Sequence, residues 1–420
     1  MATTIIPVAD VCRSARQASR RLATIDTATK DAALQAIAAL LLEHSDEVLE
    51  ANERDMQAAR ERGLSGSLLD RLALDEGRLG LMVGAVRDIA ALPDPVGEVI
   101  DGHRLPNGLD VRKIRVPLGV VAVVYEARPN VTIDATALCL KSGNAIVLRG
   151  SSVAAHTNAV LTSLAADAAQ GAGLPVGCVG LVAGGGHEEL GELATQTSTV
   201  DLIIPRGGEG LKAALQAVAT VPVIYAASGN CHVYVEATAD LDMAQAIALN
   251  AKVQRPGVCN AAEKLLIHAD VAERFTGPVV HALSGVGVRV RGDERACALA
   301  GDLAEAAGEE DWSHEYLDMT IALAIVDSTE QAIEHINRYG SGHSEAIVTR
   351  DTVAARAFQL GVDAACVYVN ASTRFTDGGQ FGMGAEIGNS TQKLHARGPL
   401  GLRELCTYRY LVDGDGHVRP

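Results

Sequence analysis

The chain has 420 residues, 48% of them hydrophobic, so it is long enough for two or three domains with sizeable cores. Its formal net charge of −16 argues against a nucleic-acid partner, and no apolar run approaches the roughly 20 residues of a membrane span. The 8 cysteines are scattered without zinc-ligand spacing, which predicts reduced thiols, a cytoplasmic protein and no metal.

Residues 8–91 are predicted to be helical, because apolar residues such as Leu34, Ile37 and Leu41 recur at three- and four-residue steps. Two extended runs follow, at 97–103 and 110–116. Between them Asn107-Gly108 predicts a hairpin, since both residues tolerate a positive φ. The strand-like tail at 404–412 is expected to pair with this hairpin in a neighbouring subunit.

From residue 118 strands and helices alternate. The expected strands are 120–125, 145–149, 178–182, 200–204 and 222–225, and the expected helices are 133–141, 152–170, 187–195 and 209–219. This spacing predicts parallel βαβ units in a doubly wound sheet, whose carboxyl edge should bind a ligand.

A second α/β unit is expected from residue 231. Its expected strands are 231–235, 264–268, 321–326, 346–349 and 366–370, and its expected helices are 241–252 and 329–339.

Cys259 follows Arg255-Pro256-Gly257-Val258, on a loop between an expected helix and an expected buried strand. Cysteine often packs as a small hydrophobe, but these polar and helix-breaking neighbours are unsuited to a core position. A thiol displayed on such a loop is suited to nucleophilic catalysis on an acyl group. We therefore predict that Cys259 is a nucleophile.

No G-x-G-x-x-G follows an early strand, so the usual dinucleotide fingerprint is absent. Two other strand ends, at 147–152 and 203–210, pass through small residues into a helix. Free N–H groups there favour an anion such as a cofactor phosphate. Alternatively, the small residues serve packing and the serines are N-caps.

Together these segments resemble the aldehyde dehydrogenase superfamily and, within it, the family of gamma-glutamyl phosphate reductases. The most specific stretch runs from Val326 to Ile347 and contains Ala332-Ile333-Glu334-His335-Ile336-Asn337-Arg338-Tyr339-Gly340-Ser341-Gly342-His343-Ser344-Glu345. Residues 125–130, the Cys259 loop and residues 370–375 also resemble that family's segments, in the same order.

The resemblance implies an aldehyde dehydrogenase-like α/β fold in three parts. These are an NADP-binding domain with a doubly wound parallel sheet (1–96 and 117–230), a second α/β catalytic domain (231–375), and a small β oligomerisation hairpin with a tail (97–116 and 400–420). It also implies reduction of L-glutamate 5-phosphate to L-glutamate 5-semialdehyde through a cysteine thioester, the second step of proline biosynthesis.

Two departures from hydrolytic aldehyde dehydrogenases have chemical consequences. Those enzymes carry a base in a Glu-Leu-Gly-Gly-Lys stretch, where this chain has Ala226-Ala227-Ser228-Gly229-Asn230 and no carboxylate. NAD-preferring relatives often carry a Glu at the position of Ser152, which would repel a 2′-phosphate. With Arg149 as a fixed cation, the expected cofactor is NADPH/NADP.

The resemblance assigns further roles. Asn130 is the candidate amide for the oxyanion, or else a turn residue, and Glu315 resembles the nicotinamide-ribose carboxylate, or else is a solvated surface Glu. Arg255 either favours the thiolate or holds phosphate, and Arg128 and Arg374 either bind substrate anions or form surface ion pairs. The expected cofactor-binding residues are Arg149, Ser151, Ser152, Gly207, Gly208 and Glu315.

Two alternatives stay open: another acyl reductase of the superfamily acting on an acyl-CoA or aldehyde, and a non-catalytic oligomeric binding protein with the same fold. The expected partners are a small-molecule substrate, further copies of the chain, and glutamate 5-kinase as a candidate donor of the unstable acyl phosphate.

Overall fold

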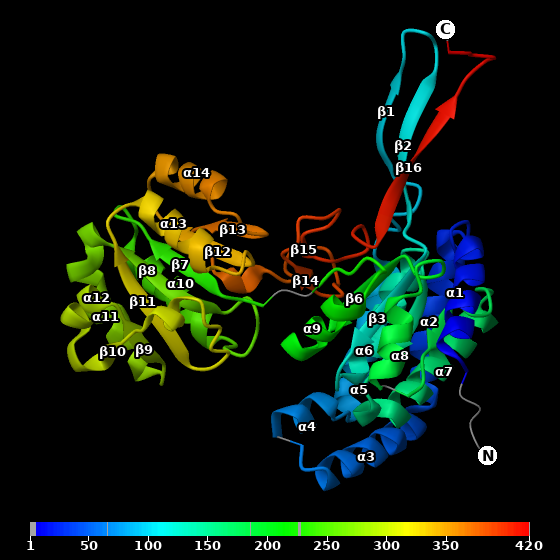
Figure 1. Ribbon diagram of the computed structural model, residues 1–420, viewed down its shortest axis with the longest axis horizontal. Helices are drawn as coiled ribbons and strands as arrows, with labels where there is room; N and C mark the ends of the chain where they lie inside the picture. Colours follow the sequence, from blue (N-terminus) through cyan, green and yellow to red (C-terminus); the bar gives the residue numbers. More distant parts are fainter. Residues whose placement is uncertain (1–5, 65, 185, 226–227, 420) are drawn as a thin grey trace. The chain divides into compact units, whose positions relative to one another are not determined.

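The amino-terminal residues form helices, as their apolar spacing predicts. They are α1 (Val8–Leu22), α2 (Thr27–Glu43), α3 (Ser45–Glu61), α4 (Gly66–Leu72) and α5 (Glu76–Ala91). The structure is a computed structural model, and it describes residues 6–64, 66–184, 186–225 and 228–419 (Figure 1). None of the helices in this part of the chain combines the length and apolar composition that a membrane crossing requires.

A four-stranded parallel sheet follows, in the order β5-β4-β3-β6. Its strands are β3 (Val120–Tyr125), β4 (Ala145–Arg149), β5 (Val179–Leu181) and β6 (Leu202–Arg206), connected by α6 (Pro129–Lys141), η1 (Ser152–Ala154), α7 (Ala155–Gly171) and α8 (His187–Ala194), with α9 (Glu209–Val218) after β6. The expected strand at 222–225 is reduced to one bridge, between Ile203 and Val223.

The order of these strands reverses between β3 and β6. The chain moves outward from β3 to β4 and β5, then returns across the sheet to β6. Right-handed crossovers therefore place α6 and α7 on one face and α8 on the other, which makes the sheet doubly wound. A ligand crevice is expected at the carboxyl edge where such an order reverses.

A seven-stranded parallel sheet forms the second half, in the order β10-β9-β11-β8-β7-β12-β13. Its strands are β7 (Cys231–Val235), β8 (Ala262–His268), β9 (Arg289–Gly292), β10 (Ala304–Ala306), β11 (Thr320–Val326), β12 (Ser344–Val348) and β13 (Cys366–Val369). The main helices around it are α10 (Leu241–Val253), α11 (Ala269–Gly285), α12 (Glu294–Ala300), α13 (Thr329–Tyr339) and α14 (Thr352–Gly361).

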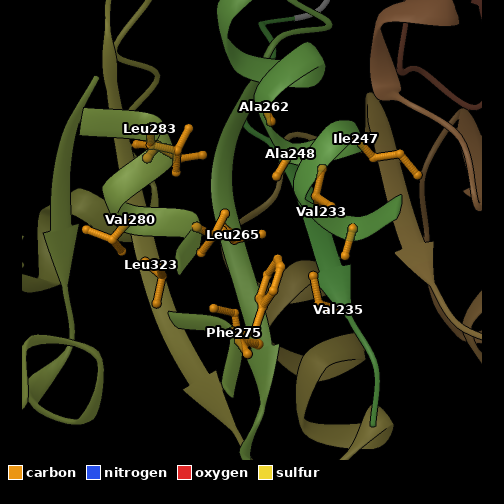
Figure 2. Packing of buried hydrophobic residues seen from close by; sticks show 14 of the residues in the cluster. Val233, Val235, Ile247, Ala248, Ala262, Leu265, Phe275, Val280, Leu283 and Leu323 are labelled. Carbon is orange, nitrogen blue, oxygen red and sulfur yellow. The ribbon is translucent and has the colours of Figure 1, made fainter. Parts of the chain in front are cut away.

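The core of this second sheet is closely packed on one face. Val233, Leu265 and Leu323 of three neighbouring strands meet Ile247 of α10 and Phe275 of α11, all nearly inaccessible to solvent (Figure 2). This packing fixes β7 and β8, and thereby the loops at their amino ends.

The predicted hairpin forms as β1 (Val99–Arg104) and β2 (Asp110–Pro117), with Gly108 at a φ of 97° in its turn. The tail forms β16 (Cys406–Asp413), which pairs antiparallel with β2 of the same chain (Figure 1). The tail thus pairs with the hairpin of its own chain, while pairing with a neighbouring subunit's hairpin stays a prediction.

The chain divides into two compact units. Unit 1 comprises Met1–Ala226, Gly382–Gly388 and Leu400–Pro420, and unit 2 comprises Ala227–Phe381 and Asn389–Pro399. The hairpin and tail thus belong to unit 1, and residues 227–230, assigned above to the cofactor domain, belong to unit 2. A short pair of strands, β14 (Asn389–Ser390) and β15 (Gly398–Pro399), lies in the second segment of unit 2.

Candidate active site

Cys259 lies half-buried on the loop between α10 and β8. Because β7 and β8 are parallel and Cys231 stands opposite Ala262, the residues preceding the two strands meet at the amino edge of the sheet. The Cys231 thiol donates to the carbonyl oxygen of Cys259 at 3.1 Å. The predicted nucleophile is therefore held by its backbone against the start of β7.

Gly229 is pressed against this loop. A Cβ atom on Gly229 would stand 1.5 Å from the carbonyl oxygen of Cys259, so that only glycine fits. The Gly229 N–H donates to Oε1 of Glu315 at 2.6 Å. Glu315, expected at the cofactor ribose, thus lies beside the segment that supports Cys259.

A third segment fixes the other side of the loop. The Asn260 amide donates to the Thr376 carbonyl at 2.9 Å, and the Thr373 hydroxyl donates to the Asn260 carbonyl at 2.7 Å. Arg374 lies between these two threonines in η4 (Thr373–Phe375), and its Nε donates to the Gln254 side chain at 2.8 Å. Residues 370–375 and the Cys259 loop, predicted separately, are thus brought together.

Positive charge gathers at this loop. Burial and then the charge of Arg255 lower the pKa of Arg374, while its interaction with Cys259 opposes the change. Arg255 is exposed and Arg374 is half-buried. Two guanidinium groups near one thiol favour the thiolate and provide donors for a phosphate or carboxylate.

The second group of predicted residues lies at the carboxyl edge of the unit 1 sheet, where Val124 pairs with Arg149 and Tyr125 pairs with Arg206. Arg149 is 7% exposed and donates to the Gly186 carbonyl at 2.6 Å. Burial lowers its pKa, and Glu189 opposes that change. Within the part of the chain that the structure describes, its Nε has no hydrogen-bond partner.

The serines after Arg149 differ in role. The Ser151 hydroxyl accepts from the Val153 N–H at 3.3 Å, which makes Ser151 the N-cap of η1. Ser152 is exposed at the first position of that short helix. The N-cap alternative therefore holds for Ser151 and does not exclude cofactor contacts by its neighbour.

Gly207 and Gly208 lead into α9. A Cβ atom on Gly207 would stand 2.7 Å from Cδ of Glu126, and the Gly208 N–H donates to Oε2 of Glu126 at 3.2 Å. A carboxylate thus already lies where this turn would hold an anion. The two glycines fit a phosphate-bearing cofactor, as does the Arg149 Nε, which has no hydrogen-bond partner among the described residues. The exposed Glu126 side chain would have to move aside.

Arg128 and Asn130 begin α6 in unit 1. The Asn130 amide donates to Asp134 at 2.9 Å, and burial raises the pKa of Asp134 to about 6 against this hydrogen bond. Arg128 is half-buried at the N-cap position. These two residues belong to unit 1, as do the 149–152 and 207–208 turns, whereas Cys259, Arg255, Arg374 and Glu315 belong to unit 2.

Sequence reasoning missed Gly229 and Glu126 as residues that shape the site. Gly229 stands in the 226–230 stretch, whose notable sequence feature is the missing base, and Ala226 lies outside the described residues. Glu126 stands in the 125–130 segment, in which Arg128 and Asn130 are the residues with an expected role. For Gly229, the available sequence signal was a glycine within the 226–230 stretch.

The chain is similar in sequence to proteins of a known family. Residues 6–299 match the aldehyde dehydrogenase family. A protein of Moorella thermoacetica named gamma-glutamyl phosphate reductase is 54% identical over 405 residues, covering 96% of this chain and 97% of that protein. A protein of the same name from Thermobifida fusca is 50% identical over 412 residues, or 98% of each chain.

A solved structure agrees with these relatives. The crystal structure of gamma-glutamyl phosphate reductase from Thermotoga maritima matches with a TM-score of 0.97 at 46% identity, covering 99% of this chain and 100% of the other. These relatives and the solved structure match nearly the whole length of the chain. The chain therefore belongs to the aldehyde dehydrogenase family.

Proposed function

We propose that this chain reduces gamma-glutamyl phosphate to glutamate 5-semialdehyde and releases phosphate, the activity for which its relatives are named. The observation that carries the proposal is a half-buried thiol, Cys259, on a loop whose charges come from Arg255 and Arg374. Such a site suits a nucleophile whose substrate is an acyl group bearing an anionic leaving group.

The chemistry divides into two steps on Cys259. The thiolate sulfur bonds to the acyl carbon, the carbon–oxygen bond to phosphate breaks, and phosphate leaves with the electron pair. The thioester carbon then accepts a hydride, the carbon–sulfur bond breaks, and the aldehyde leaves while the thiolate re-forms. The two arginines hold the phosphate and the α-carboxylate, while the Cys259 N–H and the Asn130 amide donate to the oxyanion.

The cofactor supplies that hydride, and we propose NADPH over NADH. Ser152 leaves the 149–152 turn without a carboxylate, and Arg149 adds a cation with an unpartnered Nε among the described residues. Glu315 would contact the nicotinamide ribose through the carboxylate that also holds Gly229. Arg128 is proposed as a further substrate contact.

The proposed assembly is a homo-oligomer formed through the β1-β2-β16 sheet, with glutamate 5-kinase as the partner that supplies the acyl phosphate. Large apolar side chains are exposed on this sheet, which supports an interface there.

The reverse reaction tests the proposal. Oxidation of glutamate 5-semialdehyde with NADP leaves an acyl group on Cys259, and this chain has no carboxylate at position 226 to activate water. We expect NADPH formation to stop after about one equivalent per site without phosphate, and to resume when phosphate is added.

A variant without the thiol and a change of acyl acceptor distinguish the proposed reaction from its alternatives. The Cys259→Ser variant should bind NADPH and yet form none, because only the thiol is removed. Release of the acyl group by coenzyme A, and not by phosphate, would favour the acyl-CoA alternative. Steady turnover without phosphate, with free glutamate as product, would favour a hydrolytic aldehyde dehydrogenase.

A further inference from the structure

Unit 2 contains a polar cavity whose lining does not include Cys259. Its volume is about 420 Å³, and it lies where α13 ends and β12 begins, beside the segment that carries β14 and β15. Its polar lining includes Ser341, Glu345, Asp363, Thr391, Lys393 and Arg397. The proposed reaction uses none of these side chains.

Glu345 gives the cavity wall an unused polar atom. Its side chain is fully buried, and Oε2 accepts from the His232 backbone N–H at 2.6 Å and contacts the His232 ring at 3.0 Å. Among the residues described, Oε1 has no partner, although it lies beside Gly340, another lining residue. Burial raises the pKa of Glu345 well above its usual range, while the hydrogen bond from the His232 backbone N–H and the charge of Lys264 oppose this change.

The remaining charges leave the cavity rich in donors. Lys393 and Arg397 both pair with Asp363, at 2.5 and 3.0 Å, so two cations share one carboxylate. The Nε of Arg397 is buried without a partner in the described part of the chain. A lysine and an arginine that face one space favour a ligand with acceptor oxygens and negative charge.

The same wall supports the nucleophile. The Ser341 hydroxyl accepts from the Asn230 N–H at 2.9 Å, and Asn230 directly follows Gly229, which is packed against Cys259. Glu345 likewise holds His232, its register partner in β7. A ligand that contacts Ser341 or Glu345 would therefore act on the segment behind the thiol.

We propose that this cavity is a second binding site, separate from the Cys259 site, for a small oxyanion bearing a phosphate or carboxylate group. The proposal goes beyond the proposed function and requires neither a cofactor nor a reactive thiol. Inorganic phosphate and the carboxylates of free glutamate share the required chemistry, so both serve as probes.

The single tryptophan provides the readout. The carbonyl of Trp312 accepts a hydrogen bond from the Asn230 amide at 2.8 Å. The Trp312 ring packs edge-on against the His335 ring, with 5.5 Å between the ring centroids. His335 directly precedes Ile336, which lines the cavity. Fluorescence of the Cys259→Ser protein, without cofactor, is titrated with phosphate and with glutamate, and stoichiometry is measured by equilibrium dialysis. We expect a saturable change with one or both anions.

Variants locate the site. Lys393→Gln and Arg397→Gln should each weaken binding by about tenfold or more, since each removes a charge-assisted contact. Arg295→Gln, which removes an exposed ion pair with Asp327 elsewhere in unit 2, is the matched control and should leave binding unchanged. Lys393 is largely exposed, so its variant tests the site even if Arg397→Gln fails to fold.

Two results would overturn the proposal. One is the absence of binding of either anion by fluorescence and dialysis. The other is binding that Arg374→Gln removes while Lys393→Gln leaves it intact, because the anion would then sit at the Cys259 site. Neither result concerns phosphate-dependent turnover. The proposed function is therefore tested independently, by the assay of the reverse reaction.

Discussion

At the scale of single residues, the position of the Cys259 loop depends on a close backbone contact between Gly229 and Cys259. A methyl group at Gly229 would overlap the Cys259 carbonyl, so Gly229→Ala must displace the loop or the start of β7. A displacement of about 1 Å at a reacting group costs about a hundredfold in rate. We expect at least that loss of turnover, measured in the phosphate-dependent assay.

The matched control is Gly285→Ala, at the end of α11 in the same unit, where an added methyl group meets nothing within 4 Å. It should retain full activity. Turnover of Gly229→Ala close to that of the unchanged protein would contradict the close packing of these two backbones.

Some residues of the site could be predicted from their neighbours in sequence, and others depend on contacts between distant segments. Cys259 was predicted because its polar, glycine-containing loop lies between two strongly patterned elements. The contact of Gly229 with Cys259 joins positions 30 residues apart, and that of Glu126 with Gly208 joins positions 82 apart. Such contacts depend on strand register, which periodicity in a single sequence does not specify.

At the scale of elements, the 149–152 turn should determine cofactor preference. Ser152→Glu would place a carboxylate beside a 2′-phosphate, and at about 4 Å two unit charges repel by roughly 4 kcal/mol at an effective dielectric near 20. Ser152 is exposed, so screening reduces this figure. We expect the affinity ratio of NADPH to NADH to fall at least about tenfold by binding titration.

Ser152→Gln has the same size without the charge and should change this ratio little. An unchanged ratio in Ser152→Glu would mean that the cofactor's ribose phosphate binds elsewhere.

The stability of the protein should depend on pH through His343, the residue that precedes β12. His343 is 1% exposed, and burial lowers its pKa to about 4. Between pH 6.5 and 4 the unfolded chain binds a proton that the folded chain does not, so the free energy of unfolding falls as pH falls. One such group contributes about 1.4 kcal/mol per pH unit, or about 2 kcal/mol from pH 6.5 to 5.

His343→Asn should remove this share of the pH dependence, as measured by urea unfolding followed through Trp312 fluorescence. His281→Asn, at an exposed position of α11, is the control and should keep it. Equal pH dependence in the His343 variant and the unchanged chain would show that His343 is not the group responsible.

The strands show which elements a sequence specifies. Five strands of unit 2 were predicted, because their buried apolar runs stand out between helices. The strands β9 and β10 were missed, since β9 alternates Arg289 and Arg291 with small residues and β10 is a three-residue edge strand. Strands near a sheet edge need no continuous apolar run.

At the scale of the whole molecule, the order of the elements predicted two parallel α/β sheets and a separate hairpin. It did not predict that the tail returns to its own hairpin, because the pairing of β16 with β2 joins segments about 290 residues apart in sequence, well beyond any local pattern. Self-pairing leaves the faces of the three-stranded sheet and the outer edges of β1 and β16 as the surfaces available to another copy.

One face of β16 carries exposed apolar residues at alternate positions, Tyr408, Tyr410 and Val412, which therefore point the same way. A cluster of exposed apolar side chains of this kind indicates an interface, so we expect the chain to be oligomeric through this sheet. Tyr410→Glu should lower the mass measured by light scattering, because it places a charge within the apolar contact. Leu360→Glu on α14, where the leucine is 70% exposed, should not. Because the substitution leaves the backbone pairing of β16 with β2 in place, the melting temperature of each unit should change little. An unchanged mass in Tyr410→Glu would mean that copies associate through another surface.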